Sequence, residues 1–105
     1  MKILFTTKGK EWSAELDPRF GRASGFLLYN NTSGETTWYD NENVNASHGA
    51  GINAAQKAAN LKTDVLITGH VGPKAKATLE AAGIKIFTVE KEPCTLKEAL
   101  NIYKQ

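Results

Sequence analysis

Hydrophobic residues recur along this chain with two different spacings, which separate strands from helices. Short apolar runs and alternating aromatic or β-branched residues are typical of strands, whereas apolar residues three or four positions apart indicate an amphipathic helix. The chain has five segments of the first kind, at residues 2–6, 25–30, 35–40, 64–69 and 84–89. It has three of the second kind, at residues 49–61, at residues 73–82 and from residue 95 onward. The polar stretch 7–19 is expected to be a loop.

Turn and capping residues support these boundaries. The sequence NTSG, residues 31–34, joins the second and third strands and is typical of a hairpin connection. Pro73 suits the first turn of a helix, and Gly83 suits the position just after its end. The sequence TLKE, residues 95–98, has the spacing of a capping box, so the third helix is expected to begin there.

Two of the helices have a recognisable apolar face. In the helix at 49–61 the expected buried stripe consists of Ile52, Ala55, Ala59 and, in part, Ala58. In the third helix it consists of Leu96, Ala99, Leu100 and Tyr103. The small residues of the first of these faces let the helix at 49–61 lie close to a sheet.

The order of these elements, β-β-β-α-β-α-β-α, is that of an α/β protein. A hairpin followed by right-handed βαβ crossovers gives a mixed five-stranded sheet with helices on its faces. We expect the strand order 3-2-1-4-5 with the second strand antiparallel to the others, which is a three-layer ribonuclease-H-like fold. A chain of 105 residues has room for one such core, so residues 1–105 are expected to form a single domain.

Ligands of such sheets bind beyond the carboxyl ends of the parallel strands. Those ends fall at residues 6–8, 68–72 and 89–94, and the turn 47–51 before the first helix can reach the same edge. His48, His70 and Cys94 lie in these segments and are our candidate metal ligands. The alternative is that each histidine is a solvated surface residue and that the cysteine is a half-buried small residue.

The lone cysteine limits both the compartment and the kind of metal site. Cys94 is the only cysteine, so an internal disulfide is excluded. Because the N-terminus also lacks the pattern of a signal peptide, the protein is expected to be cytoplasmic. The N-terminus of the third helix could favour a Cys94 thiolate. One thiolate cannot hold an iron–sulfur cluster that needs four, so any such cluster would have mixed His and Cys ligands or would span a dimer.

The stretch LDPRFGRASGFLLY, residues 16–29, sets two arginines around a Phe-Gly pair. Its candidate ligand-binding residues are Arg19, Phe20, Gly21 and Arg22. The glycine lets the backbone come close to a ligand, the guanidinium groups suit a polyanion, and the phenylalanine is expected to pack beneath them. Alternatively, the arginines form surface ion pairs with Asp17 and Glu15.

Two glycine turns precede helices at this edge and add Gly49, Gly51, Gly69 and Gly72 to the candidate ligand-binding residues. Glycines before a helix leave backbone N–H groups for an anion. GAGINA, residues 49–54, lacks the preceding strand of a dinucleotide fingerprint, and TGHVGPKA, residues 68–75, lacks the Gly-Lys-Ser/Thr of a P-loop. The turns therefore favour another negatively charged ligand, unless the glycines serve only close packing and tight turns.

Charge and the placement of acids exclude several function classes. The net charge is +2 and the charges are interspersed, which gives no reason to expect nucleic acid or a membrane as a partner. The first strand carries no acid and Asp64 lies at the wrong end of its strand, which disfavours a two-metal nuclease. No carboxylate is spaced to orient His48 or His70, which disfavours a small enzyme acting on a phosphorylated or carboxylated metabolite.

Four stretches, taken in order, resemble one protein family. They are DPRFGRASGF at 17–26, HGAGINAAQ at 48–56, DVLITGHVGPKA at 64–75 and LEAAGIKIF at 79–87. With these stretches the chain resembles the dinitrogenase iron–molybdenum cofactor family, which includes NifX-type carriers and the C-terminal part of NifB-type proteins. The resemblance covers nearly the whole chain and implies the ribonuclease-H-like fold. Family members associated with cluster handling often carry a histidine where this chain has Arg19.

The resemblance implies a protein without catalytic activity that binds or carries an anionic iron–sulfur or iron–molybdenum cluster or its precursor. Its partners would be the proteins that donate and accept the cluster, and the protein would be a monomer or a weak homodimer. The alternative is a regulatory or scaffold domain without metal cargo, which binds a protein partner through its sheet edge or hairpin with Trp38 or Tyr39.

Overall fold

Five strands form one mixed sheet in the order β3-β2-β1-β4-β5. They are β1 (Lys2–Thr7), β2 (Gly25–Asn30), β3 (Thr36–Asp40), β4 (Val65–Thr68) and β5 (Lys85–Thr88). β2 runs antiparallel to β1 and β3, whereas β4 runs parallel to β1 and β5. The expected strand order and directions are therefore confirmed, while the ribonuclease-H-like name for this arrangement stays a prediction.

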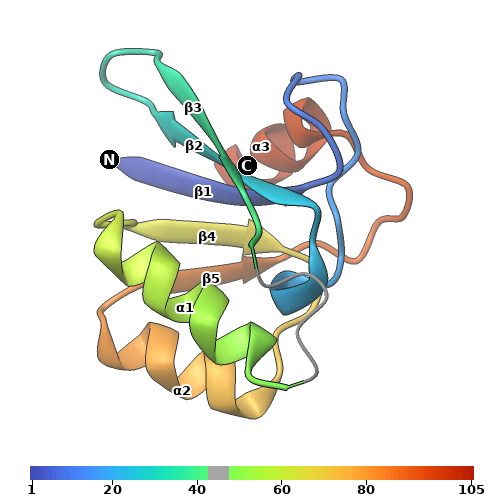
Figure 1. Cartoon of the computed structure of the whole chain (residues 1–105). Coiled ribbons are helices and arrows are strands. Elements are labelled where there is room, and N and C mark those ends of the chain that lie inside the picture. The colour runs from blue at the N-terminus through green and yellow to red at the C-terminus, as the bar shows by residue number, and fades with distance from the viewer. Residues whose placement is uncertain (43–47) are drawn as a thin grey trace.

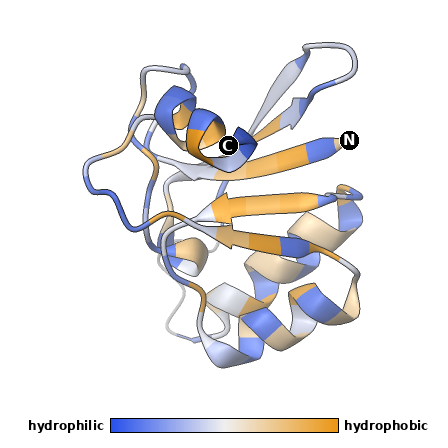
Figure 2. Ribbon diagram, turned by 180° about the vertical axis from the view of Figure 1, so that it is seen from behind, coloured by the Kyte–Doolittle hydropathy of each residue, from blue (hydrophilic) through white to orange (hydrophobic). Residues whose placement is uncertain are grey.

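The computed structural model describes residues 1–42 and 48–105, so the first residue of the expected turn 47–51 lies outside it. The helices are α1 (Ala50–Asn60), α2 (Pro73–Ala81), α3 (Leu96–Lys104) and the short 3-10 helix η1 (Phe20–Arg22). α1 and α2 lie side by side on one face of the sheet, and α3 lies on the other (Figures 1 and 2). Within the described ranges, no helix has the length and apolar character needed to cross a membrane.

The central strands are buried on both faces, because a hydrophobic core lies on each side of the sheet. Ile3 and Phe5 of β1 face the core under α3, whereas Leu4 between them faces the core under α1 and α2. In Figure 2 the ribbons of β1, β4 and β5 are largely coloured as hydrophobic. Continuous apolar runs such as VLIT in β4 fit this arrangement, because both sides of the strand are covered.

The buried face of α1 differs from the one expected from the sequence. Ala50, Ala54, Ala55 and Ala58 are buried, whereas Ile52 is 42% exposed. α1 turns its alanines inward because it packs closely against α2, where a Cβ on Gly51 would lie 3.3 Å from the Cβ of Ala75. The prediction that Ile52 is buried is therefore wrong.

The segment between β1 and β2 is more ordered than the expected loop. It forms isolated bridges between Thr7 and Leu16 and between Glu15 and Thr95. Trp12 packs edge-on against Phe5, with ring centroids 5.6 Å apart, and so helps α3 to cover its face of the sheet. The segment then ends in η1, which the sequence pattern did not predict.

The capping box expected at the start of α3 is confirmed. Thr95 Oγ1 accepts a hydrogen bond of 3.1 Å from the Glu98 amide, and the Thr95 amide donates one of 2.9 Å to Glu98 Oε1. A hydrogen bond from the Lys91 ammonium group, assisted by the bond from Thr95, lowers the pKa of Glu98 to about 2. Leu96, Ala99 and Leu100 are buried as expected. The cap therefore fixes the start of a helix that covers the sheet face opposite α1 and α2, together with Trp12.

This cap makes part of the stability depend on pH. The folded-state pKa of Glu98 is about 2, below its ordinary value of 4.5, so its contribution is complete above pH 4.5 and is lost as the pH falls toward 2. Urea unfolding over this range should show a smaller loss of stability in Glu98→Gln than in the wild type. Equal losses in the two proteins would contradict the role given to the Glu98 carboxylate.

Candidate functional site

A pocket of about 470 Å³ lies beyond the carboxyl ends of β1 and β4. It is lined by three segments: residues 18–22 with η1, the first turn of α1, and the turn that leads into α2. The candidate residues that line it are Arg19, Phe20, Gly21, Arg22, Gly49, Gly51, His70 and Gly72. The structure thus brings together residues from three distant parts of the sequence; that they bind a ligand stays a prediction.

The arginine-bearing turn is attached to the end of β4 through backbone hydrogen bonds. The His70 amide donates to the Pro18 carbonyl at 2.7 Å, and the Phe20 amide donates to the His70 carbonyl at 3.3 Å. Gly69 allows this approach, since a Cβ there would lie 2.5 Å from the Cα of Pro18. Gly69 itself does not line the pocket, so its glycine is explained by packing.

Arg19 is held by a buried carboxylate. Its Nε and Nη2 donate to the two carboxylate oxygens of Asp17, each at 3.1 Å, and Asp17 is fully buried. The hydrogen bonds and the negative charge of Asp17 raise the pKa of Arg19 above its ordinary value. The alternative that Arg19 pairs with Asp17 is therefore correct in its partner, but the carboxylate is buried and does not lie on the surface. Glu15 pairs with Lys8 at 3.4 Å.

η1 rests directly on the first turn of α1. A Cβ on Gly21 would lie 2.7 Å from the backbone nitrogen of Gly51, so only glycine fits between the two backbones. Phe20 is 2% exposed and its ring lies 6.4 Å from that of Phe26, centroid to centroid. Phe20 therefore packs beneath the pocket, as expected. Its insertion into the core holds the backbone that carries Arg19 and Arg22 in place.

Each of the two helices at the pocket is directly preceded by a glycine. Gly49 precedes α1 with a φ of 79°, and Gly72 precedes α2, and neither residue has a side chain that could cap its helix. α3, far from the pocket, has a complete capping box instead. The first amides of α1 and α2 therefore have neither an intrahelical acceptor nor a side-chain cap from the preceding residue, as in the anion sites at helix N-termini.

The pocket wall combines positive charge with apolar surface. Arg19, Arg22 and Lys74 line it together with the His70 imidazole, and none of its lining residues within the described ranges is acidic. Pro18, Phe20, Ile52, Pro73 and Ala75 supply apolar surface. Such a wall suits a bulky anion better than a small, strongly hydrated one, because the apolar side chains offer no hydrogen bonds in exchange for its water.

The other two candidate metal ligands do not line this pocket. His48 is exposed and directly precedes Gly49. Cys94 is 2% exposed and belongs to the core under α3, where its thiol donates a hydrogen bond to the Thr95 carbonyl at 3.4 Å. Burial raises the pKa of Cys94, so the expectation of a favoured thiolate is wrong.

A preformed metal centre is not found in the described part of the chain. No group of three His, Cys, Asp or Glu side chains within residues 1–42 and 48–105 is arranged to hold a metal ion.

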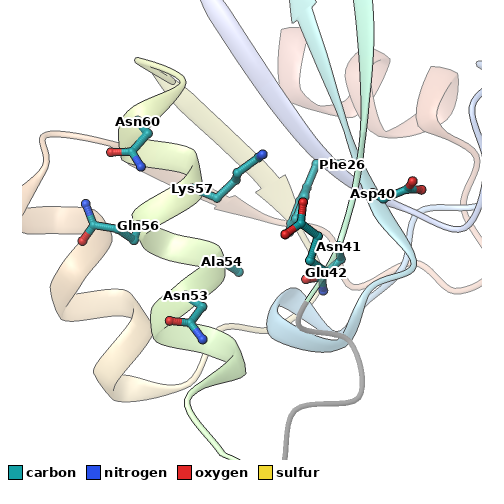
Figure 3. A pocket seen from close by; sticks show the side chains of 9 residues that line it. All are labelled: Phe26, Asp40, Asn41, Glu42, Asn53, Ala54, Gln56, Lys57 and Asn60. Carbon is teal, nitrogen blue, oxygen red and sulfur yellow. The ribbon is translucent and has the colours of Figure 1, made fainter.

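A second hollow, of about 330 Å³, lies between β3 and α1 (Figure 3). Gln56 and Asn60 point away from the β3 side of this hollow, and the Lys57 ammonium group lies 4.9 Å from the centre of the Tyr39 ring. Its side chains do not converge on one point. It lacks the set of cations found in the first pocket.

Comparison with known proteins gives the family. The family model described as dinitrogenase iron-molybdenum cofactor matches residues 1–105. The chain belongs to this family. The resemblance inferred from the four sequence stretches is thereby confirmed.

Two solved structures share the fold of this chain, and one further protein is similar in sequence. The apo form of the orange protein from Desulfovibrio gigas superposes with a TM-score of 0.91 at 40% identity, covering 98% of this chain and 86% of that one. A Thermotoga protein assigned to NifB superposes with a TM-score of 0.83 at 30% identity, with the same coverage of 98% and 86%. An uncharacterized Methanocaldococcus jannaschii protein is 31% identical over 75 residues, 69% of this chain and 64% of that protein's length.

The glycines at 69 and 72 should respond differently to the same substitution. Gly69→Ala is expected to lower the free energy of unfolding by about 2 kcal/mol or more, because the new Cβ meets the Pro18 backbone. Gly72→Ala should change it by less than about 0.5 kcal/mol, since the Cβ enters open space and the backbone is extended. Urea unfolding of both variants checks this; equal stability changes would contradict the packing described here.

Proposed function

We propose that this protein binds and carries an anionic iron–sulfur or iron–molybdenum cluster, or its precursor, without catalysing a reaction on it. The observation that carries the proposal is the pocket at the starts of α1 and α2, whose wall holds Arg19, Arg22 and Lys74 and no acidic residue among those described. Membership of the iron–molybdenum cofactor family supports a cluster as the cargo. The pocket volume of about 470 Å³ supports a site with room for an anion of this kind.

The cargo would be held by hydrogen bonds and charge. The amides in the first turns of α1 and α2 and the guanidinium groups can donate to sulfide or to the ligands of a cluster. Cys94 lies on the opposite side of the sheet, in the core under α3, so it is not placed to supply a thiolate ligand at this pocket. A cluster held in this way keeps its own ligand shell and can be released intact, which suits a carrier.

The remaining parts of the proposal follow from the role of a carrier. The partners would be the proteins that donate and accept the cluster, as in a NifX-like accessory protein. The carrier would act in the cytoplasm, as a monomer or weak homodimer. A reaction on the cargo is not part of the proposal, because the family resemblance implies transfer and no acid–base pair is spaced along the sequence for catalysis.

Anaerobic reconstitution with iron and sulfide tests the proposal. The wild-type protein is expected to retain iron after desalting and to show the charge-transfer absorption of an iron–sulfur species. If this simple cluster is not retained, a water-soluble synthetic iron–sulfur cluster dianion serves as the second probe. Failure to retain either species would overturn the proposal.

Substitutions locate the cargo. Arg22→Gln and Lys74→Gln should each weaken retention of the dianion by about tenfold or more, because each removes a charge-assisted hydrogen bond. Lys97→Gln removes the same charge from α3 and should leave retention unchanged, as should Cys94→Ala. Equilibrium dialysis with metal analysis measures these affinities, and loss of binding in Cys94→Ala alone would contradict the assignment of the pocket.

A second candidate function is a scaffold that binds a protein partner without cargo. It is favoured by β3, which lies at the edge of the sheet, pairs with β2 and carries the half-buried rings of Trp38 and Tyr39. Co-purification with a partner that is lost in Trp38→Ala, together with no retained metal, would favour this function over cluster carriage.

A further inference from the structure

A buried asparagine at the end of β3 is tied to the pocket wall from behind. Asn41 is 6% exposed, and its side-chain amide donates to the carbonyl of Gly21 at 3.0 Å and to that of Ala23 at 2.9 Å. Its backbone amide donates to the Ser24 carbonyl at 3.2 Å. Figure 3 shows Asn41 beside η1, at the end of the second hollow. One residue thus donates to three backbone carbonyls within four residues around the end of η1.

The two accepting carbonyls lie on either side of Arg22. The first carbonyl belongs to the peptide group between Gly21 and Arg22, and the second belongs to the peptide group between Ala23 and Ser24. Holding both restricts the backbone on each side of Arg22, and with it the direction in which the arginine side chain leaves the chain. η1 is only three residues long and its C-terminal carbonyls have few helical partners. Side-chain donors such as the Asn41 amide therefore supply the hydrogen bonds that backbone amides would donate to these carbonyls in a longer helix.

We propose that Asn41 is a positioning residue that orients Arg22 toward the pocket. The proposal rests on the proposed function, because the charge that Asn41 orients is one of those assigned to the anion. Asn41 does not itself line the anion pocket, so it would act through Arg22 and make no contact with the cargo. Another wall cation, Lys74, lies on α2 and is independent of this contact.

A double-mutant cycle distinguishes this role from simple loss of stability. Asn41→Ala is expected to weaken binding of the synthetic cluster dianion by about three- to tenfold through the loss of two hydrogen bonds that fix the wall. In the Arg22→Gln background the same substitution should have little further effect, because the group it orients is gone. In the Lys74→Gln background its effect should remain complete.

Salt dependence and NMR give readouts that a purely structural role would not change in this way. Asn41→Ala should lower the dependence of affinity on salt concentration, as Arg22→Gln does. Without any ligand, it should also increase the mobility of the Arg22 Nε–H group in nitrogen-15 relaxation measurements. If Asn41→Ala does not fold, Asn41→Ser, which keeps one donor, is used with the same expectations at smaller size.

The outcomes distinguish failure of the proposed function from failure of the positioning role. If the wild type does not bind the dianion, the proposed function fails, while the relaxation of Arg22 still tests the positioning role. If the wild type binds but the effects of Asn41→Ala and Arg22→Gln are additive, or Arg22 is equally rigid in the variant, the positioning role is wrong. A coupling energy between Asn41 and Arg22, together with no coupling energy between Asn41 and Lys74, supports the positioning role.

Discussion

The pocket depends on a short backbone pairing between the arginine-bearing turn and the end of β4. Two hydrogen bonds, from His70 to Pro18 and from Phe20 to His70, fix the turn beside a strand that is buried in the centre of the sheet. Through this pairing η1 comes to lie on the first turn of α1. Without it, the arginines would have no fixed position relative to the helix starts, and the residues of the pocket would not share one wall.

The remaining contacts make this wall rigid before any ligand arrives. Phe20 is inserted into the core, Gly21 touches the backbone of Gly51, and the buried Asp17 holds the Arg19 side chain. A site whose donors are already in place spends little binding energy on ordering them. The arrangement therefore suits reversible binding of a large anion, in which affinity comes from many weak donors and release requires no covalent bond to break.

The sequence was sufficient for the architecture and for most of the pocket, because both depend on local signals. Apolar runs, the capping box at Thr95 and the glycines before two helices each report on their own neighbourhood, and the topology then brings them to one edge. Long-range contacts were not predictable in this way. The sequence offered Asp17 as a partner of Arg19 but does not show that this carboxylate is buried. Nothing local to Asn41 shows that it is bonded to η1, 18 and 20 residues away. The exposure of Ile52 follows only from how closely α1 and α2 pack. Cys94 was misplaced because its position before a helix says nothing about which side of the sheet that helix covers.

The most direct measurement is the location of the cargo on the protein. Iron–sulfur clusters have paramagnetic states that are populated at room temperature and that broaden the amide signals of nearby residues. An NMR spectrum of the nitrogen-15-labelled protein with the synthetic dianion therefore maps where it lies. Broadening centred on Gly21, Gly51 and Gly72, with the α3 signals unchanged, is the expected result. Broadening centred on Cys94 and α3, with the signals of the three glycines intact, would contradict the account.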